Sequence, residues 1–354
     1  MMDRIELEER IRKLDVMDGE DFSNADFADS DLRGGVFQGC NLTGAKLSNA
    51  LLSECAFINC TLDNADLSKA DLSYANFVDS SLNGARLIEA ICVNTNFVNA
   101  SFEAADFSNV KFIQASFVNG KLVEAKFSGA SFMQSALVQC DLSRADFDGA
   151  SIEKSAVVEP VLEGTQLAKT RITLSLFQKA NLRGRDFSGA NFVRMQFGES
   201  DLAGANFENA DLTQAGFFGA NLDGANFKGA MAIGAMFIEA KLAKANFEKA
   251  NLEQALFVKS KSQGAVFTYA KAKLAQFAEA DLRNATFIGA DLTYADMSQA
   301  DLRGADLAEA KLELTNLHEI IEENTDWDGA NRHAAKPADP ALIEAQAQAR
   351  ALAK

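Results

Sequence analysis

A five-residue repeat runs through most of this chain, and it suits neither of the common secondary structures. The segment DNADLSKADLSYANFVDS, residues 63–80, shows the unit: a small residue, then Asp or Asn, then Leu or Phe, then two variable residues. The third position, here called the centre of the pentad, recurs from Phe22 to Leu317 without an insertion or deletion. Because an α-helix repeats every 3.6 residues and a strand every 2, a period of five gathers the centres on one face of neither.

A bend at every pentad solves this problem. The residue two positions before each centre is small, most often Ala, so this residue and the centre both point inward while three residues face outward. The chain then coils around its own Leu and Phe side chains, and successive coils stack. Apolar residues directly after the centres recur every 20 residues, which predicts four pentads in each coil.

The pentads are similar to those of a known family. The sequences ADL at 65–67, ANF at 205–207 and ADL at 305–307 resemble the signature of the pentapeptide repeat family, and the resemblance covers roughly residues 20–330. It implies an all-β solenoid, a right-handed quadrilateral β-helix, and the 60 pentads correspond to about 15 coils. Known members include DNA-mimicking proteins that bind type II topoisomerases and secreted effectors, so the resemblance implies no single function.

The two ends of a solenoid need covers, because their strand edges would otherwise pair with other chains. We expect short helical caps and three segments: a capping helix over 1–19, the β-helix over 20–330, and a linker with a second helix over 331–354.

The residues that make these covers are readable in the sequence. Leu7, Ile11 and Leu14 form one face of an amphipathic helix, and Asp3 suits its start. Trp327 falls on a centre where the repeat decays, and we expect it to close that end. The second helix is expected from about Pro340, with Asp339 as its N-cap.

Composition excludes several classes of function. The net charge of −16 argues against direct, sequence-independent binding of nucleic acid, which needs a basic surface. No stretch reaches the 18 apolar residues of a membrane span, and the charged start MMDRIELEER does not resemble a signal peptide. We therefore expect no membrane contact and a cytoplasmic location, with secretion by a specialised bacterial system left open.

Residues that carry chemistry are sparse, and we expect no catalytic, cofactor-binding or metal site and no cofactor. Cys40, Cys55, Cys60 and Cys140 occupy small inward positions and Cys92 occupies a centre, so we interpret all five as structural thiols. Cys40 and Cys60 should stack one coil apart, which is close enough for a disulfide. The two histidines, His318 and His333, assemble no triad, and we expect His318 on the surface.

One outer column is apolar, and we interpret it as a protein-interaction surface. The residue after every fourth centre is Val, Ile or Phe in most coils, and Val93, Ile113 and Met133 on the adjoining face would widen the strip. The competing explanation is the β-propensity of Val, but that predicts similar Val on all faces, and the faces differ. The column comprises Ile58, Val78, Val98, Val118, Val138, Val158, and later Phe218, Ile238 and Val258.

A second irregular stretch lies at residues 151–197. Pro160, Arg185 and Met195 occupy inward positions that are small elsewhere. Pro160 should remove a donor from the hydrogen-bond ladder, and Arg185 should force the wall to open, because an unpaired charge is not buried. Two interpretations stay open: a tolerated defect, or a kink that serves recognition.

Together these observations favour a non-enzymatic scaffold that presents flat β-helix faces to another protein or to a second copy of itself. A DNA-mimicking modulator of a type II topoisomerase is the first alternative, and it requires a continuous acidic strip. A bacterial secretion-associated effector or adaptor, handled by its C-terminal tail, is the second.

Overall fold

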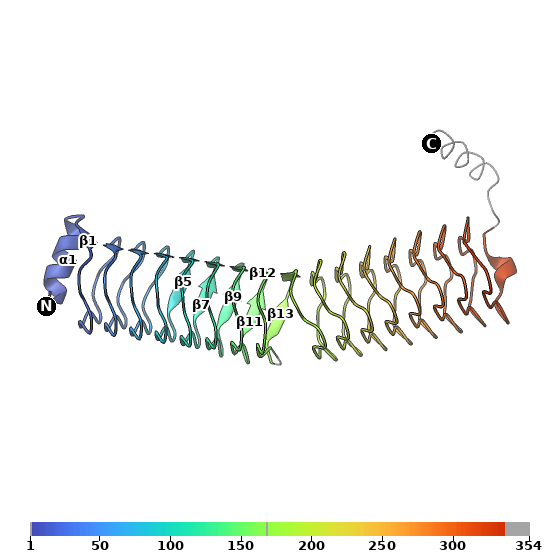
Figure 1. The fold of residues 1–354 in the computed structure, drawn as a ribbon, viewed down its shortest axis with the longest axis horizontal. Helices are drawn as coiled ribbons and strands as arrows, with labels where there is room; N and C mark the ends of the chain where they lie inside the picture. The colour runs from blue at the N-terminus through green and yellow to red at the C-terminus, as the bar shows by residue number, and fades with distance from the viewer. Residues whose placement is uncertain (1, 168, 337–354) are drawn as a thin grey trace, which may run out of the picture. The chain divides into compact units, whose positions relative to one another are not determined.

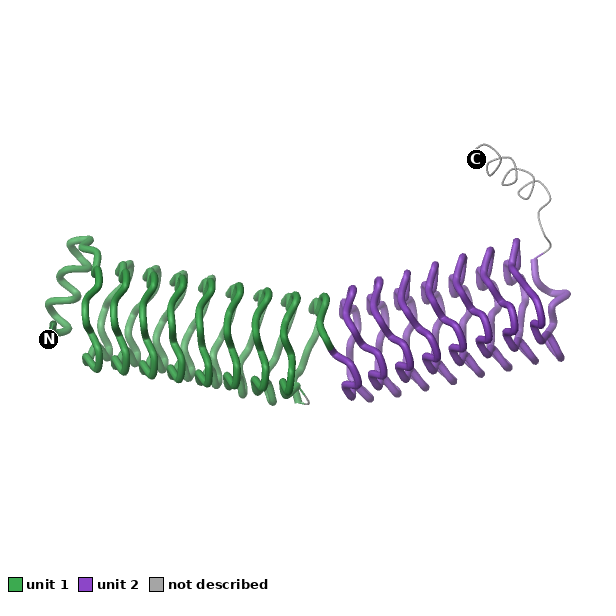
Figure 2. Tube along the Cα trace, in the orientation of Figure 1, with its two compact units in different colours: residues 1–181 green, residues 182–354 purple. Residues whose placement is uncertain are grey.

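The structure, a computed structural model, describes residues 2–167 and 169–336 and divides into two compact units (Figures 1 and 2). Unit 1 comprises residues 1–181 and unit 2 comprises residues 182–354. In both units, residues 20 apart pair in parallel, so that each turn of a β-solenoid takes four pentads. The predicted 20-residue period and the solenoid are confirmed.

The described residues of unit 1 form one helix and 14 three-residue strands, which make two parallel sheets. The first sheet has the order β1-β2-β3-β4-β6-β8-β10-β12-β14, and the second has the order β13-β11-β9-β7-β5. The elements are α1 (Arg4–Arg12), β1 (Val16–Asp18), β2 (Val36–Gln38), β3 (Ala56–Ile58), β4 (Asn76–Val78), β5 (Ile91–Val93), β6 (Asn96–Val98), β7 (Lys111–Ile113), β8 (Ser116–Val118), β9 (Ser131–Met133), β10 (Ala136–Val138), β11 (Ser151–Glu153), β12 (Ala156–Val158), β13 (Arg171–Thr173) and β14 (Leu176–Gln178).

Unit 2 keeps the same register with a different backbone. Its coils are joined by single-residue parallel bridges, such as Asp186 with Asn206 and Asn206 with Asn226, in place of three-residue strands. The described part of unit 2 ends in one short 3₁₀ helix, η1 (Arg332–Ala334). Almost every pentad of unit 2 is therefore bent by a tight turn.

Most pentads are bent by a hydrogen-bonded turn. The Ala65 N–H donates to the Leu62 carbonyl at 3.0 Å, and the residue before the donor, Asn64, has a φ of 58°. Positive φ values are tolerated best by Gly and Asn, which explains why these residues recur at the corners. Each turn closes one side of the coil, and the centre between the corners points inward.

Strand pentads lack this turn bond, and in several of them a buried side chain of the next coil supplies the acceptor. The Cys60 N–H donates to Ser80 Oγ at 3.0 Å, and the Ser135 N–H donates to Ser155 Oγ at 3.0 Å. The Ser155 N–H continues the series to Ser175 Oγ at 3.1 Å. Buried N–H groups are expensive to leave unpaired, so these inward hydroxyls belong to the strand pentads.

The core is built from the centres, and the two units pack it differently. In unit 1 one ladder of Phe rings runs along the first sheet, with Phe57 and Phe77 stacked at 4.7 Å, and shorter ladders stack Phe107 on Phe127 and Phe112 on Phe132. In unit 2 two ladders face each other: Phe247 stacks on Phe267 at 5.0 Å and meets Phe257 edge-on at 5.5 Å. Stacked and edge-on contacts are the favoured arrangements of aromatic pairs, and unit 2 combines them regularly along two facing ladders.

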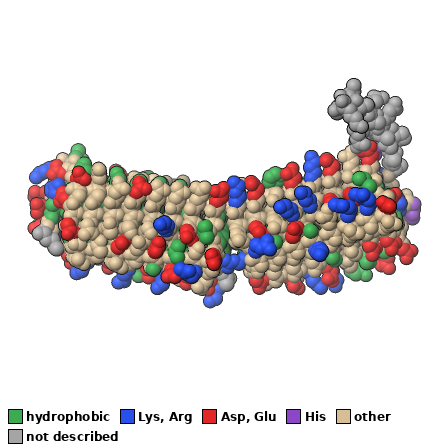
Figure 3. All heavy atoms as spheres, in the orientation of Figure 1, with side chains coloured by type: hydrophobic (Ala, Val, Ile, Leu, Met, Phe, Trp, Pro, Cys, Tyr) green, Lys and Arg blue, Asp and Glu red, His purple; other side chains and the backbone are tan. Residues whose placement is uncertain are grey.

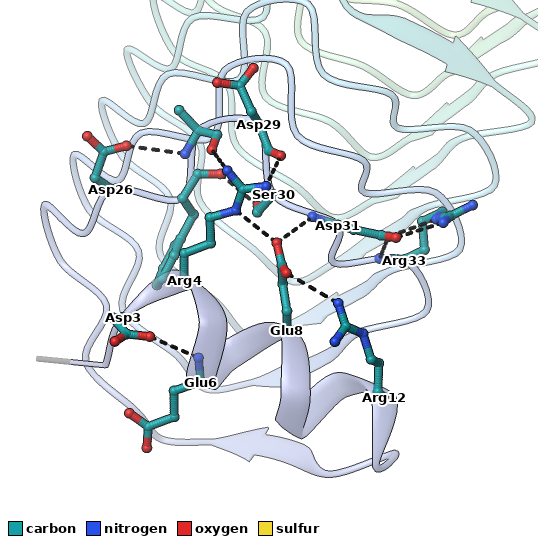
Figure 4. A network of polar contacts seen from close by, with 12 residues as sticks. Asp3, Arg4, Glu6, Glu8, Arg12, Asp26, Asp29, Ser30, Asp31 and Arg33 are labelled. Carbon is teal, nitrogen blue, oxygen red and sulfur yellow. Dashed lines mark hydrogen bonds and ion pairs between the residues drawn. The ribbon is translucent and has the colours of Figure 1, made fainter.

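Helix α1 lies against the first coil and satisfies backbone groups at its edge (Figure 4). Arg4 donates to the carbonyls of Ala28 and Asp29 at 3.2 and 2.5 Å, and Glu8 accepts the Asp31 N–H at 3.0 Å. In later coils the groups equivalent to the Ala28 carbonyl and the Asp31 N–H pair with the preceding coil. The side chains of Arg4 and Glu8 thus take the place of backbone groups that a preceding coil would supply.

The predicted first helix is correct in its start and wrong in its end. Asp3 is the N-cap and accepts the Glu6 N–H at 2.9 Å, and Leu7 and Ile11 are buried. Leu14, however, is 87% exposed with a φ of 61°, because the helix ends at Arg12.

The last coil of unit 2 pairs with the segment that follows it. The Leu312 N–H donates to Asn331 Oδ1 at 2.6 Å, and the Leu314 N–H donates to the Ala334 carbonyl at 2.8 Å. Trp327 is half-buried, with the Arg332 guanidinium 4.5 Å from its ring. The helix predicted from about Pro340 lies outside the described residues.

Candidate interaction surfaces

The predicted apolar column of unit 1 is assembled by the first sheet. Strand pairing places its members directly above one another, with Ile58 against Val78 and Val98 against Val118. Gln38 precedes the column and Gln178 follows it. All six members are half-buried, so each shows only part of its side chain to solvent: Ile58, Val78, Val98, Val118, Val138 and Val158.

The strip is flanked by a ladder of polar corner residues on one side and by the second sheet on the other. In this ladder the Asn99 side-chain amide donates to the Asp79 carboxylate at 2.9 Å, and the Asn119 side-chain amide donates to Asn99 Oδ1 at 3.0 Å. The second sheet stacks Ile113 between Val93 and Met133, and Met133 is 38% exposed. The predicted widening of the strip therefore has the residues in place.

The backbone conformation partly explains why valine recurs on these two faces. The sequence alone did not show this conformation. Every member of the unit 1 column lies in a strand, as do Val93, Ile113 and Met133, whereas the other two faces are built from turns. β-branched residues suit strands, so an uneven distribution follows from uneven backbone conformation. The column in unit 1 is thus weaker evidence for an interface than its sequence pattern indicates.

Unit 2 presents an apolar cluster that strand propensity does not explain, because its pentads are turns. Phe218 is 51% exposed, and Ile238 and Val258 follow it in register. Sequence analysis missed Met236 and Leu256, which stack beside them at the position before the centre, where Asp or Asn is usual. Together with Met231 and Ile233 on the adjoining face, these residues form what we call the unit 2 patch: Phe218, Met231, Ile233, Met236, Ile238, Leu256 and Val258.

The irregular stretch is accommodated locally. The ladder continues on both sides of Pro160, where the Glu159 N–H donates to Gln178 at 3.0 Å and the Val161 N–H donates to Cys140 at 2.9 Å. Pro160 occupies the position after a strand pentad, where the backbone N–H of another residue would make no turn hydrogen bond. Ala180, which lies one coil later, has no side-chain oxygen to which such an N–H could donate. The expected loss of a donor therefore does not occur.

The two other irregular residues differ in burial. Met195 is fully buried and fills its inward position, whereas Arg185 is half-buried. Near the strand pentads of this stretch, the small centres Ile152 and Val157 line an apolar cavity of about 10 Å³. A space of this size holds at most one water molecule, and its lining offers no polar partner.

The cysteines are free and buried. Burial raises the pKa of Cys55 to about 12 and that of Cys140 to about 11. The neighbouring Cys60 thiol lowers the pKa of Cys40, and Cys40 in turn raises the pKa of Cys60. The two cysteines lie one coil apart, as their spacing predicted.

His318 does not lie on the surface as expected. It is buried, with 7% of its area exposed. Among residues 2–167 and 169–336, no group of three or more metal-ligating side chains comes together. In the same ranges, no helix is long and apolar enough to span a membrane.

Charged residues alternate in sign along one outer column of unit 1. On one column of unit 1, bridged neighbours read Asp26, Lys46, Asp66, Arg86 and Asp106. Like charges opposite one another on neighbouring strands are destabilising, and alternation avoids this. Acidic and basic groups are likewise interspersed on the visible side of both units (Figure 3).

Two family models match the chain. One, described as "Pentapeptide repeat region", matches residues 19–87, 51–127 and 130–207. The other, described as "Pentapeptide repeats (8 copies)", matches residues 214–248, 245–284 and 280–318. No curated protein matches the chain.

Several solved structures are similar to this chain. HetL, a pentapeptide repeat protein involved in heterocyst differentiation regulation from the cyanobacterium Nostoc, is 21% identical over 93% of this chain and 97% of its own, with a TM-score of 0.23. A pentapeptide repeat protein from the Arabidopsis thaliana thylakoid lumen is 37% identical over 30% of this chain and 70% of its own, with a TM-score of 0.23. QnrB1, a plasmid-mediated fluoroquinolone resistance protein, is 21% identical over 55% of this chain and 92% of its own, with a TM-score of 0.22.

Proposed function

Because the chain belongs to the pentapeptide repeat family, we propose that it is a non-enzymatic scaffold that binds another protein through apolar parts of its outer faces. The observation that carries the proposal is the unit 2 patch, where Phe218 and Met231 are 51% and 47% exposed. Contiguous exposed apolar groups usually mark an interaction site. Other turn pentads of unit 2 mostly place polar residues or alanine at these positions, with Val193, Val266 and Ile288 as isolated exceptions, so local backbone preference does not account for the patch.

The unit 1 column is proposed as a second, flatter contact surface. Its six stacked residues span roughly 25 Å at about 4.8 Å per coil. The surface carries few charges, so a partner need not desolvate ionised groups to cover it. Half-buried valines expose little apolar surface, so they suit an auxiliary contact better than the anchor residues of an interface.

The test compares charge insertions in the two surfaces. Ile238→Glu with Val258→Glu alters the unit 2 patch, and Val98→Glu with Val118→Glu alters the unit 1 column. We expect both double variants to keep the circular dichroism spectrum of the wild type. The first should abolish capture of a partner from source-cell lysate, and the second should weaken it.

Light scattering after gel filtration measures the molecular mass of each variant. A dimeric wild type together with a monomeric unit 2 variant would identify a second copy of the chain as the partner. Unchanged capture and unchanged mass in both double variants would contradict the proposal. A matched control, Ser108→Glu with Ser128→Glu, introduces the same charges on a polar turn face and should change neither readout.

The two alternatives are less well supported. A DNA mimic needs a continuous acidic strip, and the column from Asp26 to Asp106 interleaves acids with Lys46 and Arg86. A supercoiling assay with a type II topoisomerase tests this alternative directly. A secretion-associated role would depend on the segment after residue 330, and deletion of residues 331–354 followed by an export assay tests it.

A further inference from the structure

The described part of unit 2 contains a groove that the scaffold function does not use. It has a volume of about 500 Å³ and lies where two faces of the solenoid meet, around Tyr269. Volumes of roughly 300–1,000 Å³ are typical of small-molecule sites. The polar side chains that line it are Asn251, Glu253, Tyr269, Lys271, Lys273, Asp291 and Lys311.

The floor of the groove forms because one corner residue is a glycine, which has no side chain. Tyr269 stands on a corner, and the corner residue one coil later is Gly289, with a φ of +62°. A Cβ atom at Gly289 would lie 2.5 Å from Tyr269 Cε1, so the ring rests against the glycine backbone. Tyr269 is still 53% exposed, which leaves aromatic surface free for a ligand ring.

The groove is bordered by cations. Lys271, Asp291 and Lys311 follow one another on a single column of bridges, so the two lysines stand two coils, roughly 10 Å, apart. Lys273 Nζ lies 3.8 Å from Asp291 Oδ2. Among the described residues, Lys271 and Lys311 have no carboxylate within ion-pair distance. Their ammonium groups are therefore available to an anion.

The surrounding sequence is basic within an acidic protein. Residues 241–273 hold seven lysines and two glutamates, although the whole chain has a net charge of −16. A local excess of one sign attracts ligands of the opposite sign, and a concave surface strengthens the effect. The simpler explanation, an alternating charge ladder as in unit 1, accounts for Lys271, Asp291 and Lys311 but not for the hollow or the uncovered tyrosine.

We propose that this groove binds a nucleoside phosphate. The base would stack on Tyr269, because aromatic side chains accept any base by its flat face. The phosphate would be held by the ammonium groups of Lys271 and Lys311, which flank Asp291, while Lys273 at 3.8 Å offsets the charge of that carboxylate. Asp291 and Glu253 would accept hydrogen bonds from ribose hydroxyls. The proposal is independent of the scaffold function and uses none of the residues of the unit 2 patch.

The experiment is calorimetric titration of the full chain with adenosine 5′-monophosphate at low ionic strength. We expect saturable binding of one nucleotide, with inorganic phosphate alone and adenosine alone each binding at least about tenfold more weakly, because each makes half of the contacts. Binding should also weaken as salt is added, since the phosphate contacts are screened.

Three variants test the assignment of residues. Tyr269→Ala and the pair Lys271→Ala with Lys311→Ala should each weaken binding about tenfold. Gly289→Asn keeps every ligand-binding group but displaces the ring, and Asn accepts the positive φ, so it should weaken binding to a similar extent. Matched controls are Tyr294→Ala, another corner tyrosine with 51% exposure, and Lys241→Ala with Lys261→Ala; these should bind as the wild type does.

Two results would overturn the proposal. Equal binding of inorganic phosphate and the mononucleotide would show that only diffuse charge attraction is present. Absence of saturable binding, or equal losses in the test and control variants, would show that the groove is not a site. Thermal melts monitored by circular dichroism establish that each variant keeps its fold.

Discussion

Units 1 and 2 build the same 20-residue coil with two different backbones. Unit 1 uses three-residue strands on up to two of its four faces, whereas the described pentads of unit 2 are joined through turns and single bridges. The strands of unit 1 give up a turn hydrogen bond, and several of them use a buried hydroxyl instead. Unit 2 keeps the turn bond and fills most of its inward positions with alanine. One repeat therefore supports two networks of buried hydrogen bonds.

The largest expected effect concerns the aromatic cores. Phe247→Ala in unit 2 should cost about 3–5 kcal/mol of unfolding free energy, because a large buried side chain is lost without collapse of the site. Phe77→Ala in unit 1 should cost less, since the only aromatic rings that Phe77 contacts among the described residues are its two stacked neighbours, while Phe247 also meets Phe237 and Phe257 edge-on. Urea unfolding with hydrogen exchange, which reads each unit separately, measures both. An equal or larger loss for Phe77→Ala would remove the proposed difference between the cores.

The next effect concerns proline. Ala240→Pro in unit 2 removes the N–H that donates to the Phe237 carbonyl at 3.2 Å and should cost about 3 kcal/mol. Ala100→Pro, at the equivalent position after a strand of unit 1, removes no turn bond, and Gly120 one coil later offers no side-chain acceptor. It should therefore be tolerated, as Pro160 is. Similar melting temperatures for the two variants would refute the distinction between strand and turn pentads.

A smaller effect is expected at the buried hydroxyls. Ser135→Ala leaves the Ala115 N–H of a strand pentad without its acceptor, now 3.2 Å away, and should cost about 1–3 kcal/mol. Ser30→Ala is the matched control, because the Ser30 N–H already donates to the Phe27 carbonyl of its own turn. Thermal unfolding compares the two. A larger loss for Ser30→Ala would mean that the hydroxyls do not replace the turn bond.

The smallest effect is the acid dependence of the first coil. The Arg4 guanidinium and then the Asp31 N–H lower the pKa of Glu8. Because the folded pKa lies below the unfolded value of about 4.3, the stabilisation is present above that pH and is lost as the pH falls through the folded pKa.

Glu8→Gln should flatten the pH dependence of hydrogen exchange around Asp31, and Asp281→Asn, whose pKa is lowered mainly by Arg283, should do the same in unit 2 only. Loss of the slope in both units from either variant would contradict the local origin of the effect. If Glu8 also protects the edge, Glu8→Gln with Arg4→Ala should raise end-to-end association in light scattering.

Much of the fold was readable because the repeat is strict. The centres, the inward small residues and the 20-residue column all followed from spacing, and the start of α1 followed from Asp3 and the apolar pair Leu7 and Ile11. The end of α1 was misplaced, since Leu14 fits the helical period but lies beyond the last helical turn. The unit 2 patch was only half predicted, because Met236 and Leu256 occupy an outer position that was not followed. An apolar residue at the position of the usual Asp or Asn was the available signal.

The sequence by itself determined which side chains point inward, since only one bend per pentad places every centre and every small residue in a common core. Tertiary structure alone decided whether a pentad is a strand or a turn. Val98 and Val258 occupy the same position in the repeat, yet the first lies in β6 and the second in a turn. The physical reason is that ladder hydrogen bonds join residues 20 apart, so each pentad takes a backbone that fits the coils stacked on it. The groove around Tyr269, the unit 2 patch and the unit 1 column are all produced by this stacking of coils.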